Sequence, residues 1–203
     1  MKELDIVIKE IKKQYSIINT HLKQADFYSP INLKRKTIKD IYNDNKFYLY
    51  ISKYRDYLND NITKPSASII NCQSKYRVTT RVKTLNSIQY KIRNYYLNHE
   101  NGNVPIKKCL NDIFGIRIIL KEDINTDIID YINKTFPDIK VIDSSKMDYK
   151  AIHVYFGNEI DNTCFQWELQ LWNEKNEQTN LKSHSIYKQD YVKWEKENGD
   201  ILW

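Results

Sequence analysis

The stretch RVKTLNSIQYK, residues 81–91, carries cationic and hydroxyl side chains at a spacing that suits phosphate binding. Arg81 and Lys83 are expected where a strand ends and the next helix begins. Ser87 and Lys91 are four residues apart, so they share one face of that helix. A helix N-terminus attracts anions through its free amides and its dipole. The stretch therefore predicts a phosphate site, although a solvated amphipathic helix would show the same pattern.

Two acidic residues next to apolar strands are candidates for chemistry. Asp112 precedes the strand expected at 115–121; such an acid is often only a cap, but as a magnesium ligand it would supply one carboxylate beside substrate phosphates. Glu168 lies between Gln166 and Gln170 on the polar face of another expected strand. Unpaired carboxylates are rarely buried, so Glu168 either bonds to a basic neighbour or faces a site.

The histidines and glycines exclude two common kinds of site. His153 alternates with apolar residues of 150–157 and faces away from the most apolar side, while His184, Tyr187 and Lys188 lie on consecutive turns of a closing helix. The four histidines have no HExxH spacing, which argues against zinc. Four glycines without a GxxxxGK[ST] pattern exclude a P-loop.

The positive charge is concentrated in the first part of the chain. Residues 1–120 hold 22 Lys and Arg against 10 Asp and Glu, whereas residues 121–203 hold 10 against 16. A positive field raises the local concentration of polyanions such as nucleotides or RNA, but a solvated lysine-rich surface would give the same counts. We therefore expect the partner-facing surface in the first part.

Composition indicates a single domain, 1–203, in the cytoplasm. At 203 residues two full domains would be crowded, and no window approaches the roughly 18 apolar residues of a membrane span. The N-terminus lacks the continuous apolar core of a secretory signal. Cys72, Cys109 and Cys164 are far apart, which predicts reduced, structural cysteines rather than a disulfide framework or a zinc site.

Hydrophobic periodicity predicts the elements that position these residues. Helices are expected over 3–25, 37–60, 84–98, 124–135 and 176–198, and strands over 75–83, 115–121, 139–142, 150–157 and 163–172. This order predicts an α/β or α+β fold with a mixed central β-sheet flanked by helices. The N-terminal helices would occupy 1–65, the sheet core 75–175 and the C-terminal helix 176–203.

In their order and spacing these pieces resemble the synthetase domain of the RelA/SpoT family, over roughly 75–190. Five family patterns are matched: RxKxxxSxxxK by Arg81, Lys83, Ser87 and Lys91, DxxGxR by Asp112, Gly115 and Arg117, YxxxH by Tyr149 and His153, ExQ by Glu168 and Gln170, and HxxYK by His184, Tyr187 and Lys188. The resemblance implies a nucleotidyltransferase-like synthetase fold. It also implies a diphosphotransferase, or pyrophosphokinase, that moves the β,γ-pyrophosphate of ATP onto a nucleotide 3′-hydroxyl.

The resemblance also implies roles for these residues. The ATP phosphates would be held by Arg81, Lys83, Ser87 and Lys91, with help from Arg117. Mg²⁺ would be carried by Asp112 and Glu168. Tyr149 would stack under the acceptor base, and the acceptor would also be contacted by His153, Gln170 and His184. Glu168 would orient or deprotonate the attacking 3′-hydroxyl.

Three features depart from the guanosine-alarmone synthetases. The family's Lys-x-Asn-Gly approach to the stacking tyrosine is replaced by residues 145–148, Ser-Lys-Met-Asp. After ExQ, an arginine and a threonine are replaced by Leu171, Trp172 and Asn173. No His-Asp dipeptide occurs, so we expect no HD hydrolase domain. The residues that precede Tyr149 are therefore less suited to binding a polyphosphate. This argues against a free GDP or GTP acceptor that is bound through its own phosphates.

The sequence patterns YxAIH and ExQxW resemble those of the toxin branch of the small alarmone synthetases, whose members pyrophosphorylate the 3′-CCA end of tRNA. This favours tRNA as the acceptor, with a (p)ppGpp or (p)ppApp synthetase acting on GDP, GTP or an adenosine nucleotide as the alternative. A basic segment would hold the acceptor stem through Lys34, Arg35, Lys36 and Lys39. An enzyme of this kind would slow growth, so an antitoxin partner is expected. An inactive RNA-binding module is the remaining alternative, which the retention of Asp112 and Glu168 disfavours.

Overall fold

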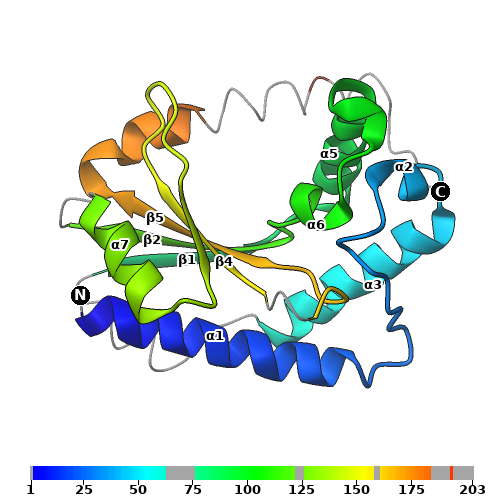
Figure 1. Cartoon of the computed structure of the whole chain (residues 1–203), viewed down its shortest axis with the longest axis horizontal. Helices are drawn as coiled ribbons and strands as arrows, with labels where there is room; N and C mark the ends of the chain where they lie inside the picture. Colours follow the sequence, from blue (N-terminus) through cyan, green and yellow to red (C-terminus); the bar gives the residue numbers. More distant parts are fainter. Residues whose placement is uncertain (1, 63–75, 122–125, 158–160, 184–192, 194–203) are drawn as a thin grey trace.

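A five-stranded mixed β-sheet forms the centre of the molecule (Figure 1). The computed structural model describes residues 2–62, 76–121, 126–157, 161–183 and 193. The strands are β1 (Tyr76–Val82), β2 (Phe114–Leu120), β3 (Lys140–Asp143), β4 (Ile152–Phe156) and β5 (Trp167–Asn173), in the order β1-β2-β5-β4-β3. β2 and β5 are parallel and the other neighbours are antiparallel. The prediction of an α+β fold with a mixed central sheet is confirmed.

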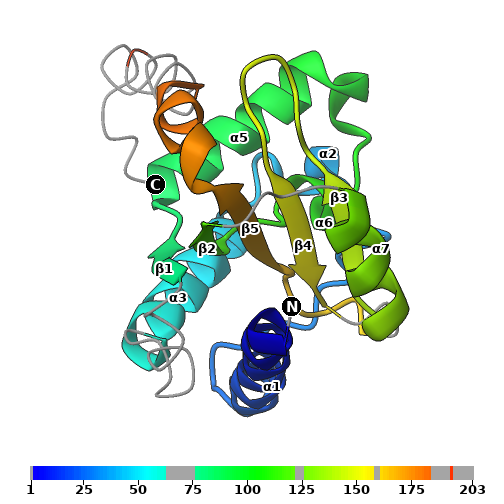
Figure 2. The same ribbon diagram turned by 90° about the vertical axis from the view of Figure 1, so that its left-hand side faces the viewer.

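The two faces of the sheet differ in chemistry because side chains alternate along each strand. One face carries buried apolar residues such as Ile118, Leu169 and Val154, and it packs with apolar residues of α1 (Lys2–Leu22) and α3 (Asn45–Asn61). Figures 1 and 2 show α1 on one side of the sheet and α5 (Leu85–Asn98) on the other. The second face therefore remains for the polar residues of the site.

The corner between β1 and α5 is fixed by hydrogen bonds from three directions. The Thr84 hydroxyl accepts from the amide of Ser87 at 3.3 Å and so caps the first turn of α5. The amide of Lys83 donates to the carbonyl of Ile113 at 2.8 Å. Arg55 of α3 donates through Nε to the carbonyl of Lys83 at 2.6 Å. These bonds hold the residues that follow β1 in place.

The single helix predicted over 37–60 is wrong, because the structure has two helices there. α2 spans Ile38–Ile41 and α3 begins at Asn45. The carboxylate of Asp44 accepts from the amides of Lys46 and Phe47 at 2.9 and 3.3 Å, so it caps a new helix. The apolar periodicity continues across the break, which explains why the pattern concealed it.

The other predicted elements differ mainly at their ends. β5 starts at Trp167 rather than at 163, because Asp161 organises a turn by accepting from the amide and hydroxyl of Thr163 at 2.9 and 2.6 Å. The prediction lacked the short η2 (Glu100–Gly102) and α6 (Ile106–Cys109). α7 spans Thr126–Thr135. The closing helix is preceded by η3 (Glu174–Asn176) and is seen over 177–183; the remainder of its predicted range lies outside the described residues, apart from position 193.

Two further predictions concern the cysteines and the presence of a membrane-spanning helix. Cys109 and Cys164 are buried free thiols, as expected, while Cys72 lies outside the described residues. In the described part of the chain, every helix is too short or too polar to cross a membrane.

Candidate active site

Three cations surround one buried carboxylate where β1, α5 and β2 meet. Lys83 Nζ donates to Asp112 Oδ2 at 2.5 Å and Lys91 Nζ donates to Oδ1 at 3.0 Å. The guanidinium of Arg81 lies 3.9 Å from Oδ2. Asp112 is 8% exposed. The predicted set of cations therefore does converge, and its positive charge exceeds that of the single acid it encloses.

The protonation of this cluster follows from its charges. Burial opposes ionisation of Asp112, but the charges of Lys91 and Lys83 outweigh it and hold the pKa of this carboxyl well below its usual range. Burial also disfavours a charged Lys91, yet Asp112 raises its pKa above the ordinary value. Burial lowers the pKa of Lys83, and the charges of Lys91 and Arg81 add to this. The charge of Asp112 opposes this shift, and an additional anion such as a phosphate would favour the charged form of Lys83 in the same way.

A glycine on β2 gives Arg81 room to reach the acid. Gly115 pairs with Arg81 of β1 on one side and with Glu168 of β5 on the other. A Cβ built on Gly115 would lie 3.4 Å from Nε of Arg81, so the arginine crosses β2 at van der Waals contact. A larger side chain here would push Arg81 away from Asp112.

The second acid, Glu168, lies on the same face of the sheet and is held by three donors. Tyr155 donates its hydroxyl to Oε1 at 3.1 Å, His153 Nδ1 lies 3.0 Å from the same oxygen, and Gln170 Nε2 donates to Oε2 at 2.7 Å. Glu168 is 5% exposed. Burial raises the pKa of Glu168, but the hydrogen bond and charge of His153 outweigh it, so the net shift is downward. Glu168 is therefore an ionised carboxylate in a nearly closed setting.

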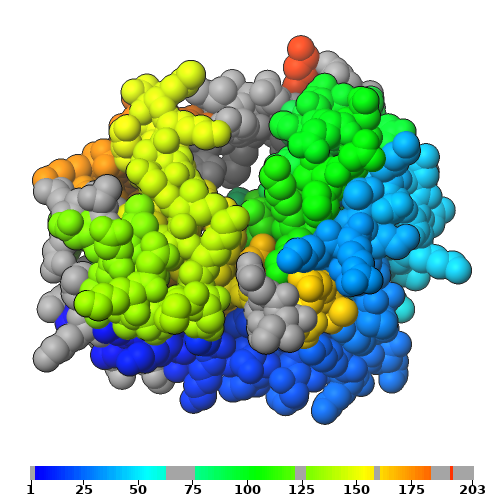
Figure 3. All heavy atoms as spheres, in the orientation of Figure 1, coloured from blue at the N-terminus to red at the C-terminus, as the bar shows by residue number. Residues whose placement is uncertain are grey.

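The two acids belong to one electrostatic site. The charge of Asp112 acts to raise the pKa of Glu168, against the larger downward effect of His153. A hollow of about 50 Å³ lies along β1 and β2, and it is lined by Arg81, Gly115 and Arg117 among others. Figure 3 shows the surface hollowed between the β3–β4 hairpin, in yellow, and α5, in green. Arg81 lies against Asp112, and its strand partner Gly115 pairs with Glu168 on the other side, while the joint binding of one metal by the two acids stays a prediction.

Tyr149, predicted to stack under an acceptor base, stands at the edge of this polar face. Its hydroxyl lies 2.9 Å from His153 Nε2 and accepts from Trp172 Nε1 at 3.3 Å. The rings of His153 and Trp172 meet it edge-on. Burial raises the pKa of Tyr149 to about 12, so the hydroxyl stays protonated. Tyr149 is partly exposed, and its role in stacking stays a prediction.

Arg117 has a different neighbourhood from the one expected for a phosphate ligand. Its guanidinium lies over the ring of Trp172, with 3.6 Å between the guanidinium carbon and the ring centroid. Nε and Nη2 donate to Oε1 of Gln170 at 3.2 and 3.1 Å. Arg117 therefore contacts Trp172 and Gln170, the residues that follow Glu168 on this face, and it lines the same hollow as Arg81. Its predicted contact with ATP stays a prediction.

Ser87 and the basic N-terminal segment are less closely tied to the site. Ser87 shares a 2.9 Å hydrogen bond with the hydroxyl of Thr84 at the start of α5. The segment between α1 and α3 exposes Lys34, Arg35, Lys36 and Lys39. Lys34 lines a large groove, whereas Lys39 lines a separate hollow, and the predicted contact of these four residues with tRNA stays a prediction. His184, Tyr187 and Lys188 lie outside the described residues.

Two residues around Glu168 had no role predicted from the sequence. Tyr155 donates to Glu168, and Trp172 stacks on Arg117 and donates to Tyr149. Both were accessible from strand alternation: Tyr155 follows His153 by two residues, and Trp172 follows Gln170 by two. Neither residue was given a role at the site, although both lie on the polar face.

The donor chemistry fits a magnesium ion. In the described residues no three His, Cys, Asp or Glu side chains gather into a metal cluster. Asp112 and Glu168 would supply two carboxylates, and Mg²⁺ takes one or two carboxylates with the remaining ligands from substrate phosphates and water. Lys83 and Lys91 now occupy the oxygens of Asp112, so phosphates that draw these lysines away would free them for a metal.

Comparisons with known proteins find similarity only among solved structures. No family model and no curated protein sequence matches this chain. Among solved structures it is similar to small alarmone synthetase 1 from Bacillus subtilis bound to its product pppGpp, at 19% identity and a TM-score of 0.46, covering 72% of this chain and 83% of that one. A GTP pyrophosphokinase family protein from Streptococcus pneumoniae aligns at 17% identity and a TM-score of 0.41, covering 70% and 73%. The synthetase 2 structure from Bacillus subtilis aligns at 17% identity and 0.41, covering 70% and 79%.

Proposed function

We propose that this protein is an ATP-dependent pyrophosphokinase that transfers the β,γ-pyrophosphate of ATP to the 3′-hydroxyl of an acceptor, with the 3′-CCA end of tRNA as the favoured acceptor. One observation carries the proposal. An ionised glutamate, Glu168, lies on the same sheet face as a cluster of three cations built around a second acid, Asp112.

The cation cluster supports a triphosphate donor. Lys83, Lys91 and Arg81 carry three positive charges against one carboxylate, and an approaching anion would favour the charged form of Lys83, whose pKa is lowered by burial. Phosphoryl transfer relies on positioning and charge stabilisation rather than on covalent chemistry by the protein. These cations would hold the phosphates of ATP and stabilise charge on the departing AMP. When bound, Mg²⁺ would add to this stabilisation at Asp112 and Glu168.

Glu168 supports the acceptor side of the reaction. A carboxylate has about four acceptor directions, and Tyr155, His153 and Gln170 fill three of them. Among the described residues this leaves Oε2 one direction for a substrate hydroxyl. Glu168 would orient the 3′-hydroxyl and receive its proton. The hydroxyl oxygen would form a bond to the β-phosphorus of ATP, and the bond from that phosphorus to the α–β bridging oxygen would break.

Label transfer tests the proposal. The protein is incubated with Mg²⁺ and γ-labelled ATP, together with tRNA, with GDP or GTP, or with an adenosine nucleotide. We expect label on tRNA, together with release of AMP, and no transfer by Glu168→Gln. Label on a free nucleotide would retain the reaction but replace the acceptor. No label on any acceptor would contradict the reaction and leave a nucleotide- or RNA-binding module.

The acceptor has consequences in the cell. Modification of the 3′ end of tRNA would block aminoacylation and inhibit translation, so we propose a cytoplasmic growth inhibitor that requires a neutralising antitoxin protein. Expression of the active protein should arrest growth, whereas Glu168→Gln should not. Equal growth arrest by both proteins would show that inhibition does not depend on transfer.

A further inference from the structure

A large groove runs along the outer side of the Glu168 cluster. It has a volume of about 730 Å³ and lies between α6, the connection from α7 to β3, and β3 itself. In Figure 3 the green and blue atoms of α6 and the Lys34 segment face the yellow-green atoms of α7 and β3 across this part of the surface. Its lining includes Lys34, Lys107, Lys108 and Lys140.

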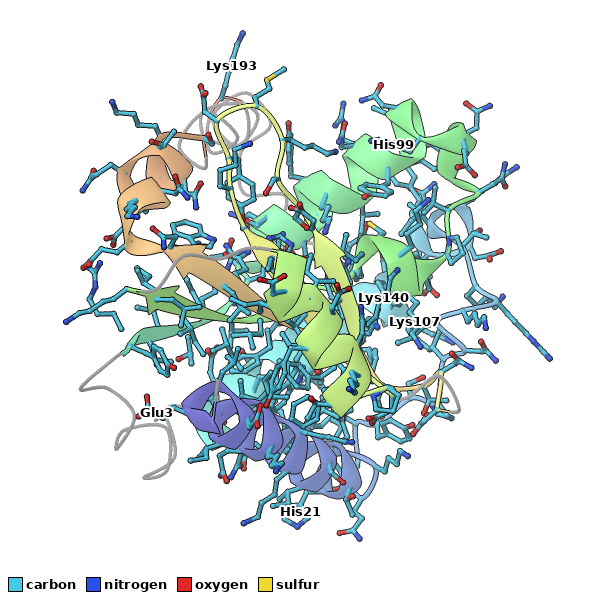
Figure 4. The ribbon with its side chains drawn as sticks, turned by 60° about the vertical axis from the view of Figure 1, so that its left-hand side comes forward. Glu3, His21, His99, Lys107, Lys140 and Lys193 are labelled. Atoms are coloured by element: carbon cyan, nitrogen blue, oxygen red, sulfur yellow. The ribbon has the colours of Figure 1, made fainter. Side chains whose placement is uncertain are left out.

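The groove has a strong excess of positive charge. Its four lysines come from three separate parts of the chain, and Lys107 and Lys140, labelled in Figure 4, reach it from α6 and β3. The acid in the lining, Asp138, is paired with Lys12 of α1 at 2.6 Å, so its charge is offset. A channel lined by one sign of charge concentrates ions of the other sign. The groove is therefore built to attract a polyanion.

The groove also reaches both halves of the candidate active site. Tyr155 lines it and donates its hydroxyl to Glu168. Asn111 lines it as well, and its Oδ1 accepts from Lys91, which also bonds to Asp112. A chain lying in the groove would therefore reach side chains that bond directly to Glu168 and to Lys91.

We infer that this groove binds the sugar-phosphate backbone of an RNA acceptor strand, with Lys108 and Lys140 contacting phosphates and the 3′ end directed toward Glu168. The inference rests on the proposed transfer to a 3′-hydroxyl. A free nucleoside diphosphate carries its phosphates at one end, whereas a strand repeats them along its length and matches lysines spread over three elements. Contacts of this kind bind RNA without regard to sequence, and they weaken with salt.

The inference also changes the expected RNA surface. Of the basic N-terminal residues singled out in the sequence, Lys34 lines the groove, while Lys39 lines another hollow. The lysines that continue the groove toward the site come from α6 and β3 and lie 73 to 106 residues after Lys34 along the chain. Their charge does not stand out as a run in the sequence.

Charge reversal on two exposed groove lysines tests the inference. The variant Lys108→Glu/Lys140→Glu is compared with the control Lys46→Glu/Lys53→Glu, which makes the same charge change at exposed positions on α3. The binding of uncharged tRNA is measured by fluorescence anisotropy at several salt concentrations, and thermal melting verifies that each variant is folded. We expect the groove variant to bind at least tenfold more weakly at physiological salt. Its slope of log affinity against log salt should fall by about 2, since each lost phosphate contact removes about one unit.

The control should bind tRNA within about twofold of the wild type. Equal weakening in both variants would show a diffuse charge effect and overturn the groove. Unchanged tRNA binding in the groove variant would also overturn the inference. This outcome would be expected if the groove bound an acidic protein instead of RNA.

The Glu168→Gln variant separates the RNA groove from the proposed transfer reaction. If it and the wild type bind tRNA through the groove but the wild type transfers no label, the groove stands and the transfer fails. If label passes only to free nucleotides at rates that the groove variant retains, the transfer stands and the RNA groove is overturned.

Discussion

Arg117 fixes the orientation of Gln170, and through it that of the glutamate. The guanidinium stacks on Trp172 at 3.6 Å and gives two hydrogen bonds to Oε1 of Gln170. With its oxygen engaged in this way, the Gln170 amide must turn its nitrogen toward Glu168, where it donates to Oε2 at 2.7 Å. A planar guanidinium can stack and donate in two parallel directions at once, which an ammonium group cannot.

The variant Arg117→Lys tests this bracing. It keeps the charge but loses the stacking and the paired hydrogen bonds, so we expect pyrophosphate transfer to fall about tenfold or more, equivalent to about 1.4 kcal/mol in the barrier. Circular dichroism should remain unchanged. Arg77→Lys on neighbouring β1 is the control, because Arg77 forms exposed ion pairs with Glu174 and Glu177. Equal rates for wild type and Arg117→Lys would show that Gln170 does not depend on the guanidinium.

Local patterns in the sequence predicted the strands and singled out the two acids, because alternation and helical spacing are local properties. The positions of Glu168 and Arg117 on the polar face followed directly from period-two alternation. The stacking of Arg117 on Trp172 did not, because it depends on the register between parallel β2 and β5. The break at Asp44 was missed because one side chain that caps a helix overrides a continuous apolar period.

Replacement of the central acid tests the cation cluster. Asp112→Asn leaves Lys83 and Lys91 buried without their counter-charge, and loss of one partner of a buried ion pair costs about 3 kcal/mol or more in the free energy of unfolding. Urea denaturation should show this loss. Tripolyphosphate without metal should raise the melting temperature of the variant more than that of the wild type, because it replaces the missing negative charge.

The matched control for that experiment is Asp138→Asn. Asp138 forms an exposed ion pair with Lys12, and exposed pairs contribute about 0 to 1 kcal/mol. Its stability should therefore stay close to that of the wild type. If Asp112→Asn unfolds at the same urea concentration as Asp138→Asn, the lysines of the cluster do not need their acid.

The pH dependence of stability provides a separate test of Asp112. Its pKa in the folded protein is held below the value of about 3.9 expected in the unfolded chain. A depressed pKa contributes stability that is fully present above the unfolded value and is lost as pH falls through the folded value. The stability difference between wild type and Asp112→Asn should thus be constant near neutral pH and shrink below about pH 4. Urea midpoints from pH 2.5 to 7 measure this, and parallel curves would contradict it.

His153 sets the ionisation of Glu168, and this predicts the acid side of the pH–rate profile. Burial alone would raise the pKa of Glu168, and the hydrogen bond and charge of His153 reverse that shift. Transfer that needs the carboxylate is present above this pKa and is lost as pH falls through it. His153→Gln retains a hydrogen-bonding side chain but removes the charge, so the acid limb should move to higher pH. The rate is measured from pH 4 to 8 with saturating ATP and acceptor.

The control is Tyr155→Phe, which removes a neutral donor to the same oxygen and should leave the acid limb nearer its original position. An acid limb that stays in place in His153→Gln would show that another group controls it, whereas a lower rate at every pH with the same limb would limit His153 to binding the acceptor.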